Sequence, residues 1–173
     1  MHKKKVFCVG FHKTGTSSIG TALEILGYQV KGYDSSILPF IKNEEYRPVK
    51  SIISQYDAFQ DNPWPIIYEY LDQNYPDSKF ILTIRDPENW YKSISKHLGG
   101  STTKMREWIY GRGDPLNNKD IYINKYQKHN KEVKKYFEDR PDKLLILEVD
   151  KNFNWYHLCS FLEQPIPSKI FPH

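Results

Sequence analysis

Apolar residues gather in three short, unbroken runs along the chain, and each run is followed by a pattern of helical period. The runs cover residues 6–9, 80–84 and 144–149, and they are rich in Val, Ile, Leu and Phe. Strands that are apolar throughout are buried on both faces, as in parallel sheets that are covered by helices. The pattern therefore predicts an α/β architecture with these three runs as strands.

Apolar positions three and four residues apart predict the helices, and punctuation by glycine, proline and small polar residues marks the breaks. Helices are predicted over residues 16–26, 63–74, 87–97, 120–139 and 153–162, with a short helix between breaks at 98–103 and 111–115. Residues 28–31 and 58–60 predict two short strands. We expect one domain over residues 1–173 with a three-layer, P-loop-like fold, in which helices flank a central, mainly parallel sheet of four or five strands.

Length, charge and cysteine content narrow the class of protein. A chain of 173 residues can bury a core without disulfides, and its net charge of +4 favours an anionic ligand without a clustered patch that would predict nucleic-acid binding. Cys8 and Cys159 lie in apolar patterns, and no Cys/His cluster predicts a metal site. No apolar run has the length of a signal peptide or a membrane span. We therefore expect a cytoplasmic protein with no membrane or nucleic-acid partner.

A glycine-punctuated segment joins the first strand to the first helix. Gly10 and Gly15 have the spacing of the triphosphate-binding motif G-x-x-x-x-G-K-[ST], but Thr16 occupies the lysine position and the lysine is Lys13. Backbone N–H groups at such a junction point toward a bound anion. Further hydroxyl donors come from Thr14, Thr16, Ser17 and Ser18. The sequence predicts an anion site whose cation lies inside the loop.

A second candidate anion site follows the strand at residues 80–84. Arg85 stands at the end of this strand, and Asp86 and Pro87 then form a typical helix start. Ser93 lies about two turns into that helix, so both side chains can reach one phosphate group.

Residues 11–18 resemble the 5′-phosphosulfate-binding loop of the PAPS-dependent sulfotransferase superfamily, in its small single-domain P-loop branch. The Arg85–Ser93 spacing is similar to that of the family's 3′-phosphate-binding pair. The resemblance implies 3′-phosphoadenosine 5′-phosphosulfate (PAPS) as co-substrate, PAP as product and no required metal. The cofactor-binding residues that it implies are His12, Lys13, Thr14, Gly15, Thr16, Ser17, Ser18, Arg85 and Ser93. The chain departs from the cytosolic enzymes in lacking their C-terminal Arg-Lys-Gly loop and the tryptophan that follows their phosphosulfate loop.

The resemblance also suggests catalytic roles. Lys13 would stabilise the negative charge that develops on the leaving phosphate oxygen. Asp61, within Gln60-Asp61-Asn62-Pro63, matches the position of the catalytic histidine in many cytosolic sulfotransferases and is the first candidate general base. His12 is the second candidate and Asp57 the third, and Asp61 could instead cap the following helix.

The acceptor is the least constrained part of this prediction. The resemblance places an acceptor gate in the glycine-flanked segment that carries Lys104, Arg106, Trp108 and Arg112, and the acceptor would be a hydroxyl or amine of a small molecule, glycan or peptide. Two alternatives remain: a P-loop kinase for a small metabolite or nucleoside, which Thr16 disfavours, and a non-catalytic protein that binds PAPS or PAP. The oligomeric state is left open.

Overall fold

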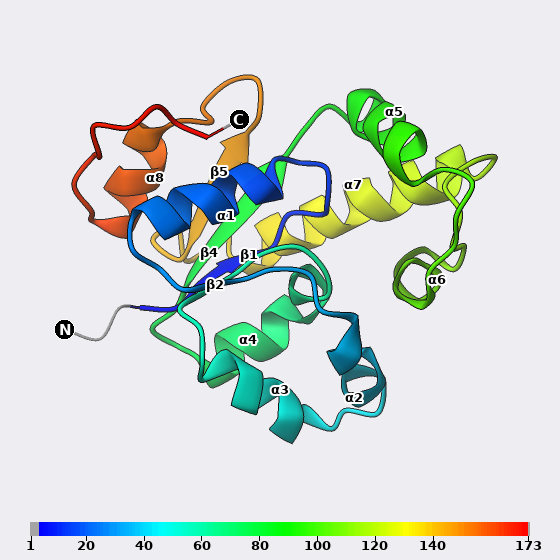
Figure 1. Cartoon of the computed structure of the whole chain (residues 1–173), viewed down its shortest axis with the longest axis horizontal. Helices are drawn as coiled ribbons and strands as arrows, with labels where there is room; N and C mark the ends of the chain where they lie inside the picture. The colour runs from blue at the N-terminus through cyan, green and yellow to red at the C-terminus, as the bar shows by residue number, and fades with distance from the viewer. Residues whose placement is uncertain (1–3, 173) are drawn as a thin grey trace.

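The computed structural model describes residues 4–172, which form one five-stranded sheet and eight α-helices (Figure 1). The strands are β1 (Val6–Cys8), β2 (Val30–Lys31), β3 (Ala58–Phe59), β4 (Lys79–Ile84) and β5 (Leu144–Glu148). Their order in the sheet is β2-β3-β1-β4-β5, and every neighbouring pair is parallel. The predicted α/β fold class is confirmed, with a sheet that is entirely rather than mainly parallel.

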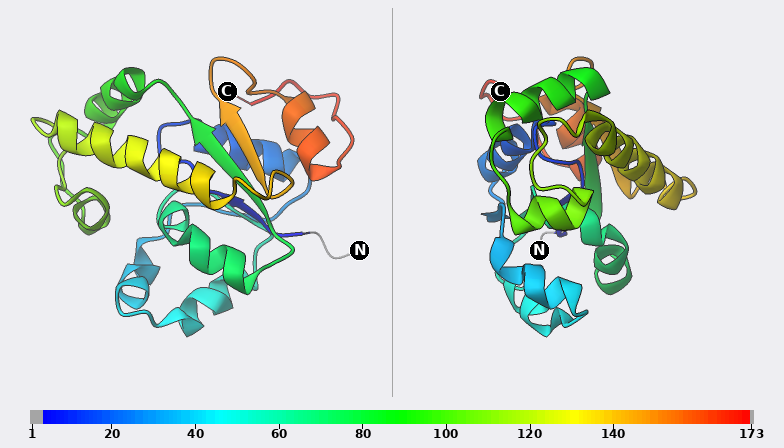
Figure 2. Two further views of the ribbon diagram at one scale, coloured as in Figure 1. Left: turned by 180° about the vertical axis from the view of Figure 1, so that it is seen from behind. Right: turned by 90° about the vertical axis from the view of Figure 1, so that its right-hand side faces the viewer.

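Helices cover both faces of this sheet. They are α1 (Thr16–Ile25), α2 (Leu38–Lys42), α3 (Tyr46–Ile53), α4 (Tyr68–Asn74), α5 (Pro87–Leu98), α6 (Lys104–Tyr110), α7 (Lys119–Tyr136) and α8 (Trp155–Leu162). Figure 1 shows α1 and α8 on one side of the sheet and α3 and α4 on the other. Seen from behind in Figure 2, α7 runs along the sheet and outward toward α5 and α6. Within residues 4–172 no helix is long and apolar enough to cross a bilayer.

The central strand β1 shows why the apolar runs become buried strands. Val6 and Cys8 pack into the cluster formed with α1 and α8, whereas Phe7 and Val9 pack into the cluster formed with α3, α4 and the end of α7. All four side chains are fully buried. Successive residues of a strand face opposite sides, so an unbroken apolar run is what a sheet covered on both faces requires.

A third apolar cluster lies beyond the sheet and joins α5, α6 and α7. Trp90 of α5 stacks on Tyr126 of α7 with 4.2 Å between ring centroids. Its indole Nε1 also donates to the backbone oxygen of His12, at 3.0 Å. This cluster attaches the helices that follow β4 to the loop that follows β1.

The structure differs from the predicted elements in two places. The stretch between β2 and β3, for which no helix was expected, contains α2 and α3; Val49 and Ile53 form the buried stripe of α3. The helix predicted over residues 63–74 is a 3₁₀ turn (Trp64–Ile67) followed by α4. Pro65 lies inside that first segment and has no N–H to donate, which disfavours a regular α-helix there.

The order of the strands places the loop after β1 at a switch point of the sheet. From β1 the chain goes first to β2 and β3 on one side, and later to β4 and β5 on the other. Parallel strands all present their carboxyl ends at one edge, and ligands of open α/β sheets bind where the direction of the connections reverses. The loops after β1, β3 and β4 therefore meet at one place.

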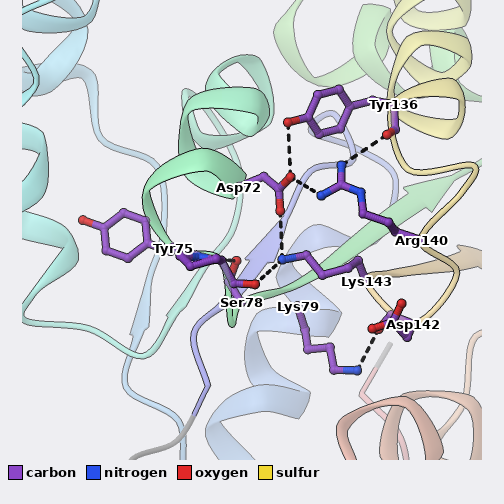
Figure 3. A network of polar contacts seen from close by, with 9 residues as sticks. Asp72, Tyr75, Ser78, Lys79, Tyr136, Arg140, Asp142 and Lys143 are labelled. Atoms are coloured by element: carbon purple, nitrogen blue, oxygen red, sulfur yellow. Dashed lines mark hydrogen bonds and ion pairs between the residues drawn. The ribbon is translucent and has the colours of Figure 1, made fainter.

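An ion-pair network around the buried carboxylate of Asp72 lies near the amino ends of the strands, away from these loops (Figure 3). Asp72 of α4, 6% exposed, has Arg140 Nη1 at 2.5 Å from Oδ2 and Lys143 Nζ at 2.8 Å from Oδ1. The Tyr136 hydroxyl donates to the same carboxylate at 3.1 Å. Burial raises the pKa of Asp72, but the hydrogen bonds and charges of Lys143 and Arg140 outweigh it and hold this pKa below its usual value. The network joins α4 to the turn that leads from α7 into β5.

We expect Asp72→Asn to lower the free energy of unfolding at pH 7 by about 2 kcal/mol, between the values for exposed and for fully buried pairs. Because the folded-state pKa of Asp72 lies below the unfolded value of about 3.9, its contribution is complete above that value and is lost as the pH falls through the folded-state pKa. Urea unfolding of both proteins between pH 7 and pH 3 measures this. A difference that stayed constant into acid would contradict it.

Candidate active site

The glycine loop, residues 10–15, leads from β1 into α1 and has an unusual backbone. Lys13 has φ 65° although it carries a side chain, and Gly15 at the helix start has φ 87°. Left-handed conformations are uncommon for residues other than glycine and cluster at functional sites. No side chain among residues 4–172 caps α1, so the first N–H groups of this helix have no side-chain capping partner in the described part of the chain.

The loop is fixed to β4 by Thr14. Its hydroxyl is fully buried and lies 2.5 Å from the backbone oxygen of Phe11 and 2.6 Å from Oγ1 of Thr83. The sequence predicted this hydroxyl as a donor to an anion, but the structure turns it toward the sheet. Thr14 therefore holds the shape of the loop instead of lining the cavity beside it.

The C-terminal part of the chain supports the loop from the other side. The ring of Phe153, which follows β5, packs against Gly15, where an added Cβ would lie 2.6 Å from Cζ of Phe153. Phe153 packs edge-on against Phe171, and Phe171 packs against Trp155 in the same way. Trp155 Nε1 donates to the backbone oxygen of Lys169 at 2.6 Å, so the tail is tied to α8.

A cavity of about 320 Å³, which we call the anion cavity, opens beside the glycine loop. It is lined by Lys13, Gly15, Thr16, Ser17, Ser18, Arg85, Ser93 and Val149. Seven of these eight were candidate ligand residues from the sequence, and they come from the loops and helices that follow two neighbouring strands, β1 and β4. The two predicted anion sites are thus one continuous cavity.

Arg85 is held at the end of β4 by Tyr126 of α7. The Tyr126 hydroxyl accepts from the Arg85 backbone N–H at 2.8 Å and donates to its backbone oxygen at 2.9 Å. Arg85 Nε is buried and has no hydrogen-bond partner within residues 4–172. A buried donor without an acceptor costs free energy. With the uncapped helix N-terminus, this donor set fits a phosphorylated anion.

A second cavity, of about 360 Å³, lies on the β3 side of the loop, and we call it the acceptor-side cavity. Its lining consists of His12, Lys13, Tyr33, Asp61, Asn62, Leu98, Ser101, Thr103, Met105 and Arg106. Lys13 lines both cavities. A cationic side chain thus stands at the boundary between a cavity rich in anion donors and one that contains a carboxylate.

Asp61 follows β3 and, like Lys13, has a left-handed backbone, with φ 66°. Burial raises the pKa of its carboxyl, and the Asn62 N–H, 2.6 Å from Oδ1, together with the charge of Lys13 partly offsets the rise. A carboxylate with a raised pKa is a stronger base than an exposed one.

His12 lies in the same cavity, 7% exposed and between two partners. Its Nδ1 is 2.8 Å from the side-chain amide nitrogen, Nδ2, of Asn62, and its Nε2 is 3.4 Å from the hydroxyl of Tyr110. Burial, then the charges of Arg106 and Lys13, lowers the pKa of His12 to about 4, so the ring is neutral at neutral pH. In the amide orientation of this structure, Nδ2–H of Asn62 donates to Nδ1, which places the ring proton on Nε2 and leaves the buried Oδ1 of Asn62 without a partner among residues 4–172. In this tautomer Nδ1 accepts from Asn62 and Nε2–H faces the hydroxyl of Tyr110.

Asp57, the third candidate base, is not part of the site. It precedes β3 and so lies at the amino ends of the strands, whereas Asp61 lies at their carboxyl ends. Its Oδ2 accepts from the backbone N–H of Gln29 at 3.0 Å. Asp57 therefore joins two chain segments and does not face either cavity.

The structure divides the predicted acceptor gate. Arg106 faces the acceptor-side cavity, whereas Lys104 and Trp108 line a separate cavity of about 600 Å³ between α2 and α6. Arg112 is exposed and lines none of these cavities. Tyr33 and Met105 carried no signal in the sequence, because they reach the site only through long-range packing.

Comparison with known proteins identifies the family of this chain. The family model of the sulfotransferase domain matches residues 5–120 and 100–173. The chain therefore belongs to the sulfotransferase domain family.

Two known proteins are similar to this chain over most of its length. The Ava biosynthesis cluster protein M of Aspergillus versicolor is 26% identical over 217 aligned positions, which cover 98% of this chain and 80% of that protein. The crystal structure of a sulfotransferase from Alicyclobacillus acidocaldarius superposes with a TM-score of 0.63 at 15% identity, over 100% of this chain and 85% of that one. The second match supports the fold.

Within residues 4–172 no group of three or more His, Cys, Asp or Glu side chains is placed to hold a metal ion.

We expect Gly15→Ala to lower the free energy of unfolding by about 2–4 kcal/mol, of which roughly 1 comes from the left-handed backbone and the rest from the contact with Phe153. Gly100→Ala is the matched control, because Gly100 has φ 76° but no atom within 4 Å of an added Cβ. Denaturant unfolding of the two variants measures the difference between them. Equal losses would show that Phe153 does not restrict the loop.

Proposed function

We propose that this protein is a PAPS-dependent sulfotransferase that moves the sulfuryl group to a hydroxyl or amine of its acceptor. The observation that carries the proposal is the position of Lys13, which lines both the anion cavity and the cavity that contains Asp61. A group in transfer between two oxygens in line needs a cation at this boundary.

The residues of the anion cavity fit the two charged ends of PAPS. The N–H groups and hydroxyls of residues 15–18 would hold the 5′-phosphosulfate at the start of α1, where the helix dipole adds to the attraction. Arg85 and Ser93 would hold the 3′-phosphate, and the free Nε–H of Arg85 would gain an acceptor. When bound, PAPS supplies the activated sulfuryl group.

Lys13 and Asp61 divide the chemistry between them. The ammonium of Lys13 would stabilise the charge that grows on the leaving phosphate oxygen, an interaction that is stronger in the transition state than in the ground state. Asp61 would accept the proton of the acceptor hydroxyl, because its carboxylate lines the same cavity and burial raises its pKa. His12, whose Nε2 carries a proton, would orient Asn62 and Tyr110 instead of acting as the base.

The cavity and the fungal relative favour a small molecule over a glycan or peptide as the acceptor. A volume of about 360 Å³ is at the lower end of the range for small-ligand sites. The relative's name places it in a biosynthesis cluster.

Cys8 and Cys159 are free and buried, which is compatible with the reducing, cytoplasmic compartment expected from the sequence.

We expect PAP to raise the melting temperature, while ATP with magnesium leaves it unchanged, because a ligand that binds only the folded state stabilises it. Arg85→Gln should need at least about ten times more PAP for the same rise in melting temperature, since it removes a charged contact to the phosphate. Lys92→Gln, which changes an exposed lysine beside Ser93, is the control. Stabilisation by ATP alone would favour a kinase and exclude the proposal.

Lys13→Ala should lower the rate of transfer of radiolabelled sulfate from PAPS to a small-molecule acceptor library by a factor on the order of 10² or more. PAP should still stabilise this variant, because the remaining donors of the anion cavity are intact. Transfer at the rate of the parent would show that Lys13 has another role. A parent protein that binds PAP but transfers to no acceptor would favour the non-catalytic alternative.

Asp61→Asn should retain PAP binding and lose transfer. In the parent, the rate should rise with pH through the raised pKa of Asp61, since only the deprotonated carboxylate accepts a proton. Asp57→Asn, which changes a carboxylate at the other edge of the sheet, should keep both the rate and this pH dependence. An unchanged rate in Asp61→Asn would assign the base to another group.

A further inference from the structure

Arg106 is a buried cation for which the reaction proposed above has no use. Its side chain comes from α6 and is 5% exposed, yet it lines the acceptor-side cavity. No carboxylate within residues 4–172 forms an ion pair with it. Buried charges in proteins are normally paired.

The hydrogen bonds of the guanidinium fix its position but do not neutralise it. Nη1 donates to the backbone oxygen of Leu98 at 3.0 Å, and Nη2 donates to the backbone oxygen and the hydroxyl of Ser101 at 2.7 and 3.0 Å. Nε is buried and without a partner in the described chain. All three bonds go to neutral acceptors, so the positive charge is held in place beside the cavity.

The other charges of the cavity are already committed. Lys13 stands at the anion cavity, and Asp61 lies within the electrostatic range of Lys13. His12 is neutral, and the remaining lining residues carry no charge. Arg106 does not line the anion cavity, so the phosphates of a nucleotide there would not be its partner.

We propose that Arg106 recognises a carboxylate on the acceptor, so that the acceptor is a small hydroxylated organic acid. This inference rests on the proposed function and names the chemical class of its substrate. The hydroxyl would lie at Asp61 and Lys13 while the acid group lies at Arg106, with Leu98 and Met105 as apolar walls for the carbon frame between them. The preset guanidinium loses little further freedom when it binds the carboxylate.

A matched pair of probes tests this. 4-Hydroxyphenylacetate and its neutral amide, 4-hydroxyphenylacetamide, are titrated calorimetrically into protein saturated with PAP. The acid should bind on the order of tenfold more tightly than the amide, as expected for a charge-assisted hydrogen bond at a partly desolvated site. Arg106→Gln should remove this preference, and Arg106→Lys, which keeps the charge but lacks the unpaired Nε–H of the guanidinium, should retain part of it.

Arg112→Gln is the control, since it removes an exposed cation from the same segment, outside the cavity. Arg106 also ties down residues 98–101, so the melting temperature of each variant is recorded, and the Arg106→Lys result separates loss of charge from loosening of this segment. Equal binding of acid and amide by the parent, no binding of either at millimolar concentration, or a preference that survives in Arg106→Gln would each overturn the inference. So would Arg106→Gln lowering transfer to acid and amide equally, because Arg106 would then act on the transferred group.

The affinity for PAP is measured first and separately. Absence of PAP binding would refute the proposed function, whereas the ratio of acid to amide affinity tests Arg106 alone. That ratio is also measured without PAP, in 10 mM inorganic phosphate, so that each proposal can fail by itself.

Discussion

The parallel pairing of β1 with both β3 and β4 is the constraint on which the site depends. It brings the carboxyl ends of β1, β3 and β4 side by side. The glycine loop, which follows β1, therefore lies between the loops that follow β3 and β4. Asp61 then lies on one side of Lys13 and Arg85 on the other. Arg85 directly follows β4, and Asp61 follows β3 after one intervening residue. The buried strands therefore position both side chains without a long connecting loop.

The packing around the glycine loop explains why Lys13 keeps a left-handed backbone there although it carries a side chain. The Thr14 hydroxyl binds Thr83, Trp90 donates to the backbone of His12, and the ring of Phe153 closes over Gly15. Each contact comes from a different part of the chain. Strained backbone survives only where the surroundings hold it in several ways. The apolar cluster of α5, α6 and α7 and the aromatic C-terminal tail are thus part of what gives the loop its shape.

Sequence reasoning was most successful where the signal is local. The unbroken apolar runs predicted the strands, and the loop spacing and the position of Arg85 predicted residues that meet in the anion cavity. It was less successful where tertiary contacts decide. The inward turn of Thr14 depends on Thr83, the exclusion of Asp57 depends on the direction of β3, and the acceptor-side cavity is closed by α6 from far along the chain. Helix α3 could have been found from the spacing of Val49 and Ile53, whereas α2 is one and a half turns long and leaves little periodicity to read.

The place of Lys13 between the two cavities links the proton affinity of one to the occupancy of the other. Its charge helps to keep the pKa of Asp61 from rising further. An anion bound in the anion cavity cancels part of this charge, so the carboxylate of Asp61 then holds a proton more tightly. By thermodynamic reciprocity, protonation of Asp61 leaves Lys13 freer to attract the anion. The carboxylate of Asp61 thus becomes a stronger base when the anion cavity is occupied, so filling one cavity changes the proton affinity of a group in the other.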